Sequence, residues 1–108
     1  GLYDGERLVG YIIATYEREW GENDLHIVNL SVDPEYRRRG VARFLLEQML
    51  AYAHQLKVGR VYLEVRVNNQ PAIELYRKCG FVITRRLERY YPRGLDGWEM
   101  VKPMNNFT

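Results

Sequence analysis

The segment that most constrains the fold runs from residue 30 to residue 46 and reads LSVDPEYRRRGVARFLL. Strand-forming residues end at Asp33-Pro34, and an arginine-rich loop follows and closes at Gly40. From Val41 onward, apolar residues recur every three or four positions, which predicts an amphipathic helix that ends near Leu56. A strand, a basic loop with a glycine and a long helix therefore follow one another directly.

Five strands, one turn and one short helix complete the expected order of elements. Strand composition or alternation marks residues 8–16, 25–32, 60–67, 81–85 and 98–101, with a turn at 21–24. Residues 87–91 either extend the fourth of these strands or begin a loop, residues 92–97 read as loop, and the tail from Pro103 reads as frayed. A short helix over 72–76 has Asn68 and Asn69 as candidate caps and Gly80 as its terminator. The resulting α/β order fits one domain, residues 1–108, around one sheet.

Composition excludes few classes of function. The net charge of +2 gives no argument for direct nucleic-acid binding, and no apolar run approaches membrane-spanning length. A second arginine cluster, at 85, 86, 89 and 93, is explained equally well by a solvated surface and by an anion site. The single cysteine cannot form an intramolecular disulfide, and no signal peptide is visible, so a cytoplasmic location is expected.

The start of the long helix has the chemistry of a phosphate site. The first N–H groups of a helix lack partners and carry partial positive charge, and Gly40 lets the backbone approach an anion closely. Arg37, Arg38 and Arg39 add positive potential, and Ala42 is small. An ordinary basic loop before a helix explains the same residues about equally well. The P-loop pattern and the dinucleotide-binding glycine pattern are both absent.

Two blocks of sequence resemble the GNAT superfamily of acetyltransferases. Arg37-x-x-Gly40-x-Ala42 is similar to that family's acetyl-CoA pyrophosphate loop, Q/R-x-x-G-x-G/A. The run YLEVRVNN at 62–69, followed by Ala72-Ile73, Leu75-Tyr76 and Gly80-Phe81, resembles the second half of the fold. The subfamily it most resembles is the protein N-terminal acetyltransferases, both RimI-like and archaeal NatA-like. The likeness extends from about Leu8 to Val101.

The resemblance implies a GNAT fold, a mixed and mostly antiparallel sheet flanked by helices. The chain begins at about the family's second strand, so the family's first strand and first two helices are expected to be lacking. The implied activity is transfer of the acetyl group of acetyl-CoA to the α-amino group of a protein or peptide, with ribosomal proteins among the candidate targets. Two alternatives stay open: an acetyltransferase for small amines or lysine side chains, and a non-catalytic acyl-CoA-binding module. The oligomeric state is left undetermined, and no metal is implied.

The resemblance also assigns cofactor contacts. Backbone groups of Leu30, Ser31 and Val32 are expected to hold the acetyl carbonyl and the pantetheine arm. The pyrophosphate is expected to lie at the loop and the first helical turn, and Asn69 and Tyr76 are expected to contact the cofactor farther along. The implied loop residues are Arg37, Arg38, Arg39, Gly40, Val41, Ala42 and Arg43.

Acetyl transfer requires a neutral amine and a proton for the leaving thiolate. An α-amino group has a pKa of about 7.7–8.0, against about 10.4 for lysine, so a weak base suffices. Glu64 is the first candidate base and His26 the second, and the two could share the role through a water. Tyr76 is the candidate acid, and Tyr90 and Tyr91 are expected to grip the peptide. Structural roles explain each of these side chains too, as strand, surface or core residues.

Overall fold

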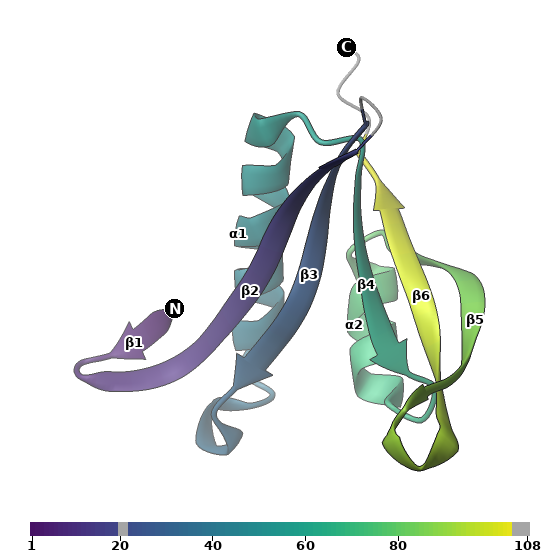
Figure 1. Ribbon diagram of the computed structural model, residues 1–108. Coiled ribbons are helices and arrows are strands. Elements are labelled where there is room, and N and C mark those ends of the chain that lie inside the picture. The colour runs from purple at the N-terminus through teal and green to yellow at the C-terminus, as the bar shows by residue number, and fades with distance from the viewer. Residues whose placement is uncertain (20–21, 105–108) are drawn as a thin grey trace.

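A computed structural model describes residues 1–19 and 22–104 of the chain. These described residues form six strands, two helices and two 3-10 turns, arranged as Figure 1 shows. The strands are β1 (Leu2–Asp4), β2 (Arg7–Glu19), β3 (Glu22–Val32), β4 (Arg60–Arg66), β5 (Val82–Tyr91) and β6 (Leu95–Pro103). The helices are α1 (Val41–Leu56) and α2 (Gln70–Lys78), and the 3-10 turns are Pro34–Tyr36 and Pro92–Gly94.

The strands form one mixed sheet in the order β1-β2-β3-β4-β6-β5. Every neighbouring pair is antiparallel except β3 and β4, which run parallel. Figure 1 shows α1 behind β2 and β3, and α2 behind β4 and β6, so both helices cover the same face. The predicted α/β fold with a mixed, mostly antiparallel sheet is confirmed.

The sheet splits along its middle. β3 and β4 are paired only where Asp24–His26 lies beside Arg60–Tyr62. Beyond this seam β3 stays with β2 as far as Val32, while β4 stays with β6 as far as Arg66. Figure 1 shows the two half-sheets diverging from the seam toward the starts of both helices. From residue 27 to residue 32, the edge of β3 that faces β4 therefore has no strand beside it in the described part of the chain.

The core lies between the sheet and the two helices. Strict alternation in β4 buries Val61, Leu63 and Val65, each at most 5% exposed, and turns the residues between them to the other face. The rest of the chain adds Leu25, Ile27, Leu46, Ala53, Val58, Ile73, Phe81 and Met100. Side chains from both half-sheets thus share one core, which joins the halves where backbone pairing does not.

The predicted helix boundaries hold well, with one difference in the apolar stripe of α1. Tyr52 belongs to that predicted stripe but is 52% exposed. One residue corresponds to about 100° of helix rotation, so Tyr52 turns away from the buried Ala53 beside it. Asn69 is the cap of α2, since its Oδ1 accepts from the Ala72 N–H at 3.3 Å, and Gly80 has the expected positive φ of 96°.

Strand boundaries show larger differences from prediction. β1 was not predicted, and residues 22–24 continue β3 instead of forming a turn; Gly21 lies outside the described residues. Residues 87–91 continue β5, and β6 begins at Leu95 inside the stretch predicted as loop. In each case pairing with a neighbouring strand decides the conformation over local propensity. Pro103 ends β6, while 105–108 of the predicted frayed tail lie outside the described residues.

Candidate functional site

The start of α1 offers unpaired backbone N–H groups to open space. Gly40 is the N-cap residue, with φ 79° and ψ 8°, and no side chain caps the helix. A methyl group built on Gly40 would meet no atom within 4 Å. A left-handed residue followed by helical residues points successive N–H groups to one side, which is the geometry of an anion-binding nest. The loop therefore has the backbone geometry of an anion site, and its predicted phosphate role stays a prediction.

The three loop arginines are not equivalent. The Arg37 Nε donates to the Val32 carbonyl at 3.2 Å, and the Arg39 guanidinium lies 5.2 Å from the centroid of the Tyr36 ring. The Tyr36 hydroxyl in turn donates to an Asp4 Oδ at 2.7 Å, which ties the loop to β1. Arg38 has a positive φ of 62°. None of the three arginines pairs with a carboxylate among the described residues, so their positive charge stays available to an anion.

The split in the sheet lies between this loop and α2. Residues 30–32 occupy the end of β3, on the edge that faces the gap. Such an edge can hydrogen-bond an extended amide chain as a strand would. At the far side Asn69 uses its Oδ1 to cap α2, and its Nδ2 donates to no group of the described chain. The predicted residues 30–32, 37–43 and 69 thus lie at the end of β3, in the loop and first turn of α1, and just before α2.

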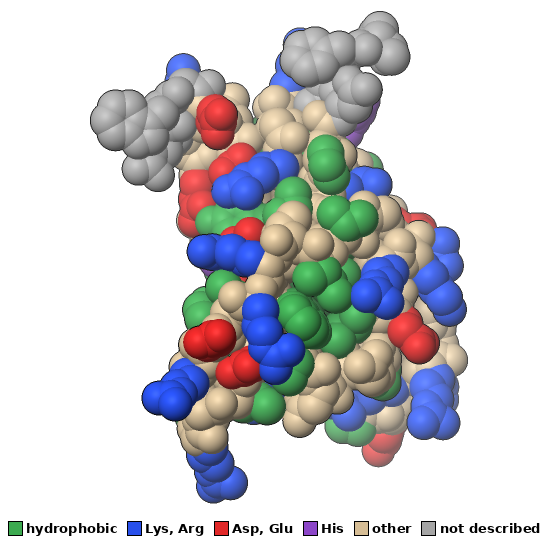
Figure 2. Space-filling view, turned by 90° about the vertical axis from the view of Figure 1, so that its right-hand side faces the viewer, with side chains coloured by type: hydrophobic (Ala, Val, Ile, Leu, Met, Phe, Trp, Pro, Cys, Tyr) green, Lys and Arg blue, Asp and Glu red, His purple; other side chains and the backbone are tan. Residues whose placement is uncertain are grey.

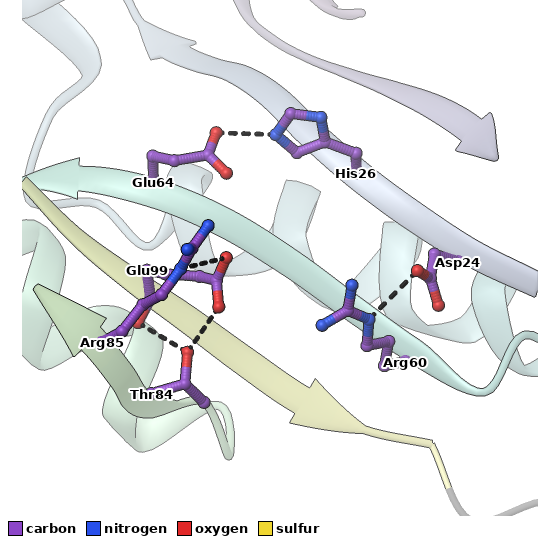
Figure 3. A network of polar contacts seen from close by, with 7 residues as sticks. All are labelled: Asp24, His26, Arg60, Glu64, Thr84, Arg85 and Glu99. Carbon is purple, nitrogen blue, oxygen red and sulfur yellow. Dashed lines mark hydrogen bonds and ion pairs between the residues drawn. The ribbon is translucent and has the colours of Figure 1, made fainter. Parts of the chain in front are cut away.

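A polar cluster lies on the sheet face that the helices leave bare. His26 alternates with the buried Leu25 and Ile27, and its Nε2 lies 2.7 Å from Glu64 Oε1 (Figure 3). The contact between these two candidate bases is direct. Both side chains are shielded, at 20% and 16% exposure. The carboxylate of Glu64 and the imidazole of His26 therefore form one acid–base unit next to the seam.

Two members of this cluster were missed by sequence reasoning. The Glu17 Oε2 lies 3.6 Å from His26 Nδ1, and the Tyr62 hydroxyl donates to the other Glu17 oxygen. The Tyr62 and His26 rings are stacked, 4.3 Å apart and within 4° of parallel. Burial, followed by the hydrogen bond to Glu17, raises the pKa of Tyr62 well above its ordinary value. The alternation of β4 places Tyr62 on the face of Glu64, but nothing in the sequence shows that Glu17 reaches them.

A second carboxylate on the same face is held away from this unit. Glu99 is the register partner of Glu64 on β6, so the two side chains share a face. Figure 3 shows Glu99 bound by Thr84 and Arg85, at 2.8 and 3.3 Å. Arg60 likewise pairs with Asp24 at 3.0 Å beyond the seam. Among these acids, only Glu64 and Glu17 have the imidazole of His26 as partner.

The three candidate tyrosines lie near one another on α2 and β5. Tyr76 packs edge-on against Phe81, with ring centroids 5.9 Å apart, and burial raises the pKa of its hydroxyl. Tyr91 packs edge-on against Tyr90 and lies under the Arg66 guanidinium, 4.8 Å away. Burial raises the pKa of Tyr91, with smaller increases from Tyr90 and Glu64. Tyr91 is therefore within electrostatic reach of the candidate base.

Gly97 was also missed, and it makes room for Tyr91. A methyl group on Gly97 would lie 2.8 Å from the Tyr91 ring and 3.3 Å from the Val65 carbonyl. The ring thus lies directly against the backbone of β6. A glycine at a strand position signals such close approach, but its partner cannot be read from the sequence.

The second arginine cluster is partly neutralised. Arg85 pairs with Glu99, and Arg86 pairs with Asp96 at 2.7 Å. Figure 2 views the side of the molecule at β5, where hydrophobic side chains gather in the middle and Lys and Arg side chains surround them. The ion pairs favour the structural explanation for Arg85 and Arg86. No helix among the described residues is long and apolar enough to cross a membrane.

Comparison with known proteins agrees with this geometry. An N-alpha-acetyltransferase of Sulfurisphaera tokodaii is 40% identical over 94% of this chain, which spans 65% of that protein. The Escherichia coli [ribosomal protein bS18]-alanine N-acetyltransferase is 40% identical over 68% of this chain, corresponding to 49% of its own length. Among solved structures, Arabidopsis thaliana Naa50 in complex with the bisubstrate analogue CoA-Ac-MVNAL superposes with a TM-score of 0.79 and 33% identity, covering 89% of this chain and 66% of that one.

The family assignment rests on a family model that matches most of the chain. Residues 1–81, which include β1 to α2 and end just before β5, match the Acetyltransferase (GNAT) family. This stretch includes the loop at Gly40, the seam between β3 and β4, and the His26–Glu64 pair. The chain belongs to the GNAT family of acetyltransferases.

Proposed function

We propose that this chain transfers an acetyl group from acetyl-CoA to the α-amino group of a protein or peptide. The observation that carries the proposal is the sheet split, which has a phosphate-binding loop at one side and an acid–base pair at the other. The relatives named above are N-alpha-acetyltransferases, and one neighbour was crystallised with a CoA-peptide analogue. The chain spans about two thirds of the length of its first relative, so the activity of the whole protein is part of the proposal.

The residues present fit acetyl-CoA. The uncapped N–H groups after Gly40 would hold the pyrophosphate, with Arg38 and Arg39 beside them. The free edge of β3 at Leu30–Val32 would hydrogen-bond the amide-containing arm, and the Asn69 Nδ2 would donate to it from the opposite side. When bound, acetyl-CoA supplies the activated thioester carbonyl.

The proton of the attacking amine goes to the His26–Glu64 unit. An α-ammonium group has a pKa of about 7.7–8.0, so a shielded carboxylate or imidazole, directly or through one water, can take its proton near neutral pH. A lysine side chain, with a pKa of about 10.4, is almost fully protonated at neutral pH, so the same groups would have to remove its proton from a much weaker acid. This chemistry favours the α-amine over lysine as the acceptor.

Tyrosine side chains would supply the acid for the leaving thiolate and the contacts to the peptide. The Tyr76 hydroxyl, whose pKa burial raises above its ordinary value of 10, carries its proton at neutral pH and would be the donor to the departing sulfur. Tyr91 and the half-exposed Tyr90 stand near Glu64, where they would hold the first residues of a peptide by ring packing and hydrogen bonds. The same placement favours a peptide over a small amine.

One assay separates the alternatives. Acetyl-CoA is incubated with peptides that differ in their first two residues, including one that begins with alanine, and with N-terminally blocked peptides that contain lysine. Release of CoA together with acetylation of the α-amine supports the proposal. Acetylation of lysine or of small amines alone would contradict it, and CoA binding without turnover would indicate a binding module. Glu64→Gln serves as the inactive control, and Glu6→Gln, at an exposed acid in the β1–β2 turn, serves as the matched active control.

A further inference from the structure

We propose that Glu17 is a positioning residue for His26 and that Tyr62 holds Glu17 in this role; the catalytic part of the inference rests on the proposed function. The His26 ring has a carboxylate at each nitrogen. Glu64 lies 2.7 Å from Nε2, and Glu17 lies 3.6 Å from Nδ1. The second distance is that of an ion pair rather than of a formed hydrogen bond. Glu17 therefore acts through charge and orientation.

The ring is fixed from more than one direction. Stacking on Tyr62 sets the plane of the imidazole, and the Tyr62 hydroxyl fixes one oxygen of Glu17, which leaves the other oxygen facing Nδ1. Arg60 lies 4.7 Å from the centroid of the Tyr62 ring and is itself paired with Asp24. Three neighbouring strands, β2, β3 and β4, thus contribute to the orientation of one histidine.

This arrangement decides which nitrogen carries the proton in the resting state. The 2.7 Å contact between Nε2 and the Glu64 carboxylate needs a hydrogen between the two atoms, so Nε2 donates to Glu64 and Nδ1 is the nitrogen that faces the Glu17 anion. The His26–Glu64 unit gains one proton from the amine, and with that proton on Nδ1 the ring is an imidazolium between two carboxylates. The charge that forms on the imidazole is then balanced by Glu17, in the way a buried aspartate supports a catalytic histidine. The proton can leave through Glu17, which is the most exposed member of the cluster at 40%.

The test uses the two histidines of the chain, His26 and His54. Imidazole ¹⁵N NMR of the free protein is recorded across pH for the wild type, Glu17→Gln, Glu17→Asp and Tyr62→Phe, with Glu6→Gln as control. Glu17→Gln keeps the size of the side chain but removes its charge, so the Nδ1 ¹⁵N shift of His26 should change more than the Nε2 shift, which the contact with Glu64 fixes. His54, on α1, should not change. Tyr62→Phe keeps the stacked ring and should give a smaller change of the same kind, and Glu17→Asp should retain most of the wild-type signal.

Kinetics supply the second measurement. Glu17→Gln should lower kcat by about tenfold, a fraction of the effect expected of the base itself, and leave the KM for acetyl-CoA unchanged. The acidic limb of the kcat profile should shift to lower pH, because loss of the Glu17 charge destabilises the imidazolium against its other neighbours, Glu64, Tyr62 and Arg60. Identical ¹⁵N shifts in the wild type and Glu17→Gln would overturn the inference. A changed His26 signal in a protein that transfers no acetyl group would support the positioning role and contradict the proposed function instead.

Discussion

Replacement of Gly40 by alanine tests the phosphate loop most directly, because its two effects can be separated. Gly40 has φ 79°, a conformation in which a Cβ atom costs about 1–2 kcal/mol. Reduced freedom of the unfolded chain offsets about 0.4–1 kcal/mol of this cost. The free energy of unfolding should therefore fall by about 1 kcal/mol, or roughly 5 °C in Tm.

The effect on ligand binding should be larger than this strain. The new methyl group would meet no protein atom within 4 Å, and it would stand beside the N–H groups that are proposed to hold the phosphate. Loss of two charge-assisted hydrogen bonds, each contributing about 1.5–3 kcal/mol, corresponds to a loss of at least about 3 kcal/mol. The Kd for CoA should accordingly rise about 100-fold.

Two other glycines provide matched controls. Gly5 and Gly94 also have positive φ, 60° and 72°, and a Cβ on either would meet nothing within 4 Å. Gly5→Ala and Gly94→Ala should therefore lose the same stability while keeping their affinity for CoA. Thermal unfolding gives the first quantity and titration calorimetry with CoA the second. If Gly40→Ala weakens CoA binding no more than Gly5→Ala does, the reasoning about this loop is wrong.

Three further changes test other parts of the site. Glu64→Gln should lower kcat about 100-fold in the peptide assay and leave CoA affinity in calorimetry unchanged; a wild-type kcat would remove Glu64 from the mechanism. Gly97→Val should displace the Tyr91 ring, because a Cβ on residue 97 would lie 2.8 Å from it. The KM for peptide should then rise about tenfold, while the KM for acetyl-CoA should not change. Equal changes in both KM values would contradict a peptide-specific role. Asp96→Asn should lower Tm near pH 7, because the Arg89 N–H and the Arg86 guanidinium hold the pKa of Asp96 below its ordinary value of 3.8. A carboxyl group with a lowered pKa contributes stability that is present above pH 3.8 and is lost as pH falls through the folded-state pKa. The Tm difference between Asp96→Asn and wild type should therefore disappear in acid. A difference that persists in acid would point to a cause other than charge.

The sequence predicted well those features that depend on neighbours along the chain. The apolar spacing of α1, the capping by Asn69 and the alternation of β4 are local patterns, and the structure has all three. β1 is only three residues long, too short for a pattern to be recognised. Arg89, inside β5, and Arg93, between β5 and β6, have left-handed backbone conformations, and nothing in the composition of that stretch predicts strand pairing on either side.

The residues of the candidate site also fall into a predicted group, close together in sequence, and a missed group, brought together only by the fold. The loop at Gly40 was predicted because its residues are contiguous, and the Glu64–His26 pair was predicted only as a shared role. Glu17 and Tyr62 are 45 residues apart, and their contact depends on the register of β2 against β3 and of β3 against β4. Register follows from packing across the whole sheet, so a single sequence does not specify it in readable form. Gly97 illustrates the same limit, since its importance depends on which side chain comes to rest on it.

Because β3 and β4 pair over only three residues each, the sheet is not continuous across its middle. The helices, which begin next to Gly40 and Asn69, cover one face of the sheet, and His26 with its carboxylates lies on the other face. Under the proposed function, acetyl-CoA and the peptide would therefore approach the gap in strand pairing from opposite faces. In this arrangement the donor and the acceptor would be bound at the same time, so no covalent acyl-enzyme intermediate would be needed.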